Sequence, residues 1–184
     1  FRPVAALQAA LPSLPPVNAQ IVQTLLAYPR DGRHTYYWPR SGDGVSYDGS
    51  TTDVYLGSLK VMRGEPKQRT FCCGLTLEVF YRVLARQSQL PGWLADEKSA
   101  ARFKSLWFCR EINSPGPEEA LLTFGLGRKV SPAEALPGDF VQLWRAGRTG
   151  HSVIFVGWAR DLKGRVVGLH YWSTQDSTNG IGFT

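Results

Sequence analysis

The order of helical and strand-forming segments is the feature that most restricts the fold of this chain. Apolar residues recur at helical spacing within "RTFCCGLTLEVFYRVL" (69–84), "DEKSAARFKSLWFC" (96–109) and "PEEALLTF" (117–124). From residue 137 onward, the runs "GDFVQLWRAG", "HSVIFVGWARD" and "GRVVGLHYWST" are β-rich, with Gly-containing turns between them. Helices followed by consecutive strands predict an α+β fold, with the helices packed on one face of an antiparallel sheet.

The N-terminal portion predicts a helical arm. "VAALQAALPSLPPVNAQIVQTLLAYP" holds two short helical patterns broken by "PSLPP", and Asn18 is placed to cap the second helix. A chain of 184 residues with 43% hydrophobic content can bury one proper core. We therefore expect an arm over residues 1–29 and a single domain over residues 30–184.

The segment between residues 30 and 68 is rich in Gly, Ser, Asp and Tyr and carries no sustained hydrophobic period. Its part "SGDGVSYDG" (41–49) resembles a calcium loop in composition, but it lacks the ligand spacing and the terminal Glu of one. We expect a long, turn-rich loop here.

Charge and hydropathy restrict the partners of the chain. The formal net charge of +6 favours contact with anionic material, but the basic residues are scattered and form no nucleic-acid-binding arm. No run of about 18 apolar residues is present, so we expect no transmembrane segment. We expect a monomer that binds no nucleic acid.

The three cysteines, Cys72, Cys73 and Cys109, cannot form a disulfide framework, because an odd number leaves at least one thiol free. Cys72 and Cys73 are adjacent, lack the two-residue gap of a zinc knuckle, and have no nearby His pair. We expect neither a metal nor a cofactor.

A helix N-terminus stabilises a thiolate, and Cys72 or Cys73 would lie at one. A nucleophilic thiolate needs a general base, and the chain has only three histidines, His34, His151 and His170. His151 begins an apolar strand. A hairpin about "RDLKG" would bring the polar cluster "HYWSTQD" towards it.

These segments resemble a known family. "FCCGLTLEVF" is similar to the "DCSGLV" helix start of NlpC-type cysteine peptidases, and "LPGDFVQLWRAGRTGHSVIFVGW" resembles their "PGDLVFF…HVGIYLG" segment, which related CHAP amidases share. The resemblance covers about residues 69–173. It implies the papain-like fold, in which a Cys on a helix N-terminus faces a His on a β-strand.

The resemblance also implies the site. Cys72 matches the nucleophile and His151 the base, while His170 is the closest match to the third residue on the following strand. A register slip of one residue would turn His170 away, so Gln175 remains an alternative orienting group. Tyr37 in "YYWPR" matches an upstream tyrosine of the oxyanion or substrate region.

The function that the resemblance implies is a cysteine hydrolase acting on peptide or amide bonds of bacterial cell-wall peptidoglycan. It also implies a secreted, periplasmic or cell-envelope location. The alternative is a non-catalytic module on the same fold that binds a glycan or peptide. Phe71, which stands where the family has aspartate, favours that alternative.

Overall fold

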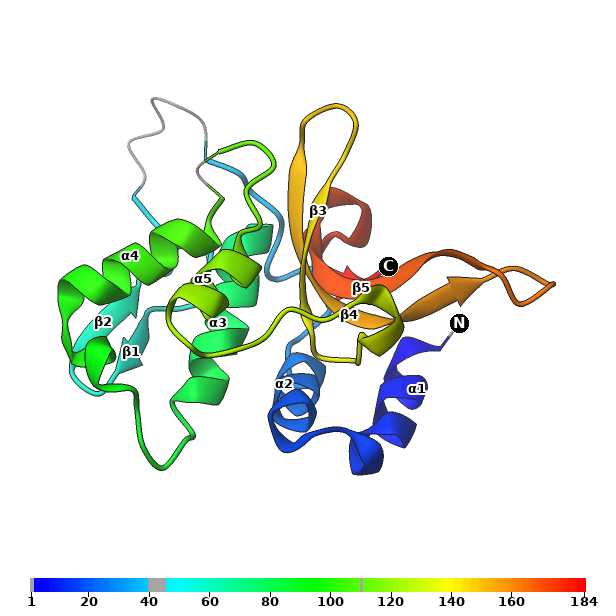
Figure 1. Cartoon of the computed structure of the whole chain (residues 1–184). Coiled ribbons are helices and arrows are strands. Elements are labelled where there is room, and N and C mark those ends of the chain that lie inside the picture. The colour runs from blue at the N-terminus through cyan, green and yellow to red at the C-terminus, as the bar shows by residue number, and fades with distance from the viewer. Residues whose placement is uncertain (1, 40–45, 110) are drawn as a thin grey trace.

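Helices precede a sheet in the computed structural model, which describes residues 2–39, 46–109 and 111–184 (Figure 1). Its helices are α1 (Pro3–Ala10), α2 (Pro16–Leu26), α3 (Cys72–Leu84), α4 (Glu97–Trp107) and α5 (Pro117–Thr123). Its strands are β1 (Val54–Leu56), β2 (Leu59–Met62), β3 (Phe140–Trp144), β4 (Gly150–Arg160), β5 (Val166–Gln175) and β6 (Gly180–Phe183). The predicted α+β class is confirmed. Within the described ranges, no helix is both long and apolar enough to cross a membrane.

Four strands form an antiparallel sheet in the order β3-β4-β5-β6. The three predicted strand runs are β3, β4 and β5, and the expected hairpin joins β4 to β5. The prediction of a loop over residues 30–68 is wrong in part, because β1 and β2 pair there as an antiparallel hairpin. Strands of three and four residues are too short to show a period. Residues 40–45 of the predicted loop lie outside the described residues.

Helix α3 lies between the two halves of the molecule in Figure 1. Leu77, Tyr81 and Leu84 pack on the side of α4 and the β1–β2 hairpin, where Phe103 and Trp107 are fully buried. The other side of the helix packs on α2 and the sheet, through a cluster that includes Leu75, Val79, Val83, Ile154 and Trp172. A helix that is buried on nearly every side is fixed in position by packing all round.

The N-terminal helices are part of this packing. Leu7 of α1 and Val22 of α2 are buried in the same cluster as the sheet. The expectation that Asn18 caps α2 is wrong, because the helix begins at Pro16, whose fixed φ suits the first helical position. The Asn18 amide instead donates to the Pro137 carbonyl at 3.1 Å and to Asp139 Oδ1 at 2.8 Å. The arm is therefore tied to the start of β3.

Gly74, in the first turn of α3, permits a close approach of the backbone. A Cβ built at this position would lie 1.8 Å from the carbonyl oxygen of Asp48 and 2.8 Å from the Cα atom of Gly49. Both contacts are with backbone, which cannot rotate away as a flexible side chain would. The glycine after the two cysteines therefore holds the segment at Asp48 against the start of α3.

We expect Gly74→Ala to lower the free energy of unfolding by about 1–3 kcal/mol, as overpacking of a buried site does. Urea denaturation followed by circular dichroism measures the change. Gly92→Ala is the matched control, because no atom lies within 4 Å of a Cβ built there. Equal stability of the two variants would contradict the close approach at Gly74.

Candidate active site

Cys72 is the first residue of α3, and Phe71 is the N-cap residue with extended backbone. Within the described part of the chain, the backbone N–H groups of Cys72, Cys73 and Gly74 have no backbone acceptor. The first turn also contains no acidic side chain. The unpaired N–H groups and the positive end of the helix dipole therefore act on the Cys72 sulfur without an opposing charge in the first turn.

Three neighbouring groups favour the anionic form of the Cys72 sulfur. The largest effect is the hydrogen bond from the Cys73 side chain, which lowers the pKa of Cys72. The hydrogen bond and positive charge of His151 lower this pKa further, and so does the backbone hydrogen bond from Ser152. Together they outweigh burial and hold the pKa of the Cys72 thiol well below its usual range. Cys72 is therefore the thiolate of the pair.

The backbone N–H of Ser152 reaches Cys72 because β4 and β5 part at this end. The paired residues of the two strands begin at Ile154↔Trp172 and continue to the hairpin turn, so Ser152 has no partner on β5 in this ladder. The rest of Ser152 is held firmly. Its hydroxyl donates to Gln142 Oε1 at 2.6 Å, and its carbonyl accepts from the Ser173 hydroxyl at 2.8 Å.

Gln175 orients the His151 ring. Nε2 of His151 lies 3.0 Å from Gln175 Oε1. An amide oxygen only accepts, so Nε2 carries a proton and Nδ1 is the nitrogen left for the thiol. The Tyr171 hydroxyl donates to the same oxygen at 3.0 Å, and the Gln175 amide nitrogen donates to Ser177 and Thr184. Because both the oxygen and the nitrogen of the Gln175 amide have hydrogen-bond partners, the amide has one orientation.

The structure brings Cys72, His151 and Gln175 together, but it does not bring His170 to them. His170 pairs with Gly157, five residues before Gln175 on β5. At about 3.3 Å per residue that is roughly 17 Å along the strand. Five is also an odd number, so the His170 side chain points to the opposite face from Gln175. Of the two predicted candidates for the third position, the structure therefore places Gln175, and not His170, beside His151.

The charge of Cys72 acts on Tyr36, the residue directly before the predicted Tyr37. Burial and the charge of Cys72 raise the pKa of Tyr36 to about 12. The ring of Tyr37 instead lies under the Arg69 guanidinium, 3.6 Å from ring centre to Cζ, and stacks on Tyr47.

The other two thiols are protonated. Burial raises the pKa of Cys73 well above its usual range, and its hydrogen bond to Cys72 raises it further. Burial and the charge of Cys72 raise the pKa of Cys109 to about 11. The sequence patterns predict no role in the site for Ser152 or Gln142. No signal in a single sequence marks those two polar residues.

Across the described ranges, no group of three or more His, Cys, Asp or Glu side chains is arranged to hold a metal ion. Comparison of the chain with family models, with curated proteins and with solved structures gives no match. The assignment of a function therefore depends on the geometry of the site and on the chemistry of its residues.

We expect Cys73→Ala to raise the pKa of Cys72, because it removes the hydrogen bond that lowers this pKa most. Cys73→Ser keeps an O–H donor and should keep the low pKa. The rate of iodoacetamide alkylation at Cys72 as a function of pH, mapped by mass spectrometry, measures both variants. At neutral pH the alanine variant should react several-fold more slowly than the serine variant. Identical profiles would contradict the donor role of Cys73.

Proposed function

We propose that the chain is a papain-like cysteine hydrolase that cleaves peptide or amide bonds. The observation that carries this proposal is the chain of contacts from Cys72 through His151 to Gln175. A thiolate at a helix N-terminus, a ring with one nitrogen facing it, and an amide fixing the other nitrogen together meet the requirements of nucleophilic catalysis.

The mechanism is acyl transfer through a thioester. The Cys72 sulfur attacks the amide carbonyl carbon and forms an S–C bond. Nδ1 of the His151 imidazolium gives its proton to the amide nitrogen, and the C–N bond breaks as the amine leaves. His151 then takes a proton from water, whose oxygen attacks the thioester. The C–S bond breaks, and the carboxylic acid product and the free thiolate result.

The tetrahedral intermediates carry a negative oxygen that needs hydrogen-bond donors. The backbone N–H of Cys72 is one candidate donor, since it has no backbone acceptor within the described residues. The Tyr36 hydroxyl is the second. With a pKa of about 12, it keeps its proton at neutral pH and remains a donor beside the thiolate.

For the substrate, we propose peptide or amide bonds of bacterial cell-wall peptidoglycan, in a secreted, periplasmic or cell-envelope setting. The family resemblance of the two motif segments supports this choice. The net charge of +6 also suits an anionic wall polymer.

Digestion of purified peptidoglycan tests the proposal. The protein should release fragments with new amine and carboxyl ends, detected by mass spectrometry, and Cys72→Ala should release none above background. His151→Ala should lower the rate by about 10²–10⁴-fold, the usual contribution of general acid–base catalysis. Cys73→Ser is the matched control and should keep most of the activity. A Cys72→Ala protein that works at the wild-type rate would rule out the mechanism.

The role of Tyr36 has its own test. We expect Tyr36→Phe to lower kcat by about 10²–10³-fold, as loss of one oxyanion donor does in a comparable enzyme. Tyr37→Phe is the control on the adjacent residue and should leave kcat within a few-fold of the wild-type value. Steady-state kinetics on a released fragment measures both. The reverse order of the two variants would move the donor back to Tyr37.

A further inference from the structure

Strand β3 presents an unpaired edge. It is the first strand of the four-stranded sheet, and β4 covers only one of its sides. The flanking hydrogen bonds, Phe155 N–H to the Asp139 carbonyl and Arg145 N–H to the Thr149 carbonyl, show which residues face β4. Strict alternation then turns the backbone N–H and C=O groups of Phe140, Gln142 and Trp144 away from β4. Within the described residues these groups have no other backbone partner.

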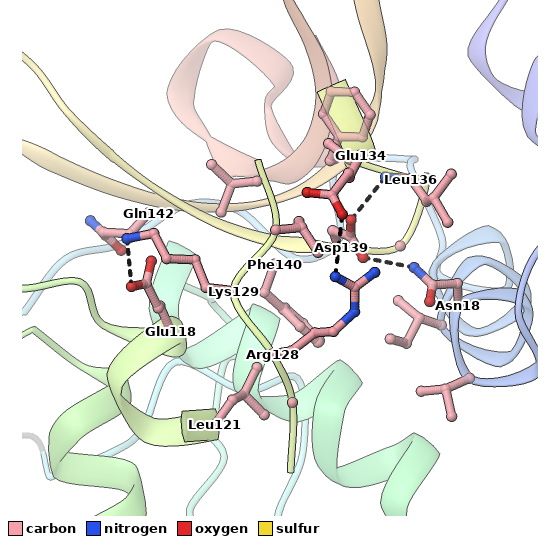
Figure 2. Close-up of a pocket in the computed structure, with 18 of the residues that line it drawn as sticks. Asn18, Glu118, Leu121, Arg128, Lys129, Glu134, Leu136, Asp139, Phe140 and Gln142 are labelled. Carbon is pink, nitrogen blue, oxygen red and sulfur yellow. Dashed lines mark hydrogen bonds and ion pairs between the residues drawn. The ribbon is translucent and has the colours of Figure 1, made fainter. Parts of the chain in front are cut away.

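A second segment with unpaired backbone groups lies across from this edge. We call residues 126–136, which connect α5 to β3, the strap. The backbone groups of its residues 127–130 make no hydrogen bond to any other part of the described chain. The strap and β3 both line one cavity of about 850 Å³ (Figure 2). Its volume falls in the range of about 300–1,000 Å³ that is usual for ligand sites.

The cavity has an apolar lining, and the charged side chains around it have polar partners. Side chains from three helices and β3 supply the apolar lining, among them Ile21, Phe80, Val83, Leu121 and Phe140. The charged side chains in the lining are paired with one another or with neutral groups, as the dashed lines in Figure 2 show. These pairs are Lys129 with Glu118, Arg128 with Glu134, and Asp139 with the Asn18 amide and the Leu136 N–H. An uncharged occupant therefore fits best.

We propose that the groove between β3 and the strap binds an extended, uncharged peptide segment as a fifth strand beside β3. Alternate residues of the segment would pair with the backbone of Phe140, Gln142 and Trp144. The side chains of the bound segment that face the helices would be apolar. At about 3.4 Å per residue, the five residues of β3 span roughly 17 Å, which sets the length of the paired segment. This peptide site is separate from the proposed catalytic site.

Backbone N-methylation gives a direct test, because it removes a donor without changing a side chain. The probe is a fluorescein-labelled set of eight-residue peptides in which Val, Ile or Leu alternates with Ser or Thr. Binding to the full chain is measured by fluorescence anisotropy. For the tightest peptide, methylation of the alternate amides that face β3 should weaken binding by at least about ten-fold. Methylation of the other set should change it by less than about three-fold.

A pair of protein variants locates the site. Leu136, at 39% exposure, lines the cavity, whereas Leu162, fully exposed in the β4–β5 turn, does not. Leu136→Asp should weaken binding at least about ten-fold, whereas Leu162→Asp should not change it. Denaturation curves check that both variants are folded. Cys72→Ala should bind the peptide normally even if it has lost all hydrolase activity, so the two proposals fail separately.

Three results would overturn the peptide site. The first is that no member of the peptide set binds. The second is that binding does not depend on which amides are methylated or on Leu136→Asp. The third is a dimer in sedimentation experiments that Leu136→Asp dissociates, which would make a second copy of the chain the occupant of the β3 edge.

Discussion

The hydrogen bonds that converge on the Cys72 sulfur are the interactions on which the site depends. They come from two parts of the chain: Cys73 next to it in α3, and the start of β4, which supplies the His151 side chain and the Ser152 backbone. Each donor favours the anion, and a buried anion without them would be costly. The ladder between β4 and β5 stops at Ile154 and does not include Ser152. A complete ladder would leave no N–H of Ser152 for the sulfur.

The surrounding structure keeps these donors in place. The hydroxyls of Thr70 and Thr174, both fully buried, are 2.8 Å apart and tie the segment before α3 to β5. The Ser173 hydroxyl ties β5 to the Ser152 carbonyl in turn. Thr70 lies close to Cys72 in the sequence, and Ser173 and Thr174 directly precede Gln175. Cys72 and Gln175 are therefore held in place relative to each other by buried polar contacts.

The sequence predicts the elements of this fold better than the contacts between them. The periodicity of α3, the three long strand runs and the β4–β5 hairpin are local patterns, and the structure contains them. His170 shows where local patterns fail. Which residue of β5 lies beside His151 depends on strand register, and the β4–β5 pairing has two irregularities, between Phe155 and Gly157 and between Ala159 and Arg160, that no composition signals.

Polar contacts between distant segments are the least predictable part. The Ser152–Gln142 hydrogen bond and the approach of Tyr36 to the thiolate arise only after folding, from residues without any motif. The two short strands β1 and β2 are likewise not predicted by the sequence, because they are defined by their pairing and not by a sequence pattern.

An ultraviolet titration tests the central claim most directly. The absorbance of a thiolate is followed as a function of pH for the wild-type protein and for Cys72→Ala, and the difference isolates the ionisation of one sulfur. The structure predicts that this difference rises well below the ordinary cysteine pKa of about 8.5. A rise at or above that value would show that Cys72 is an ordinary buried thiol, and would contradict the account of the site.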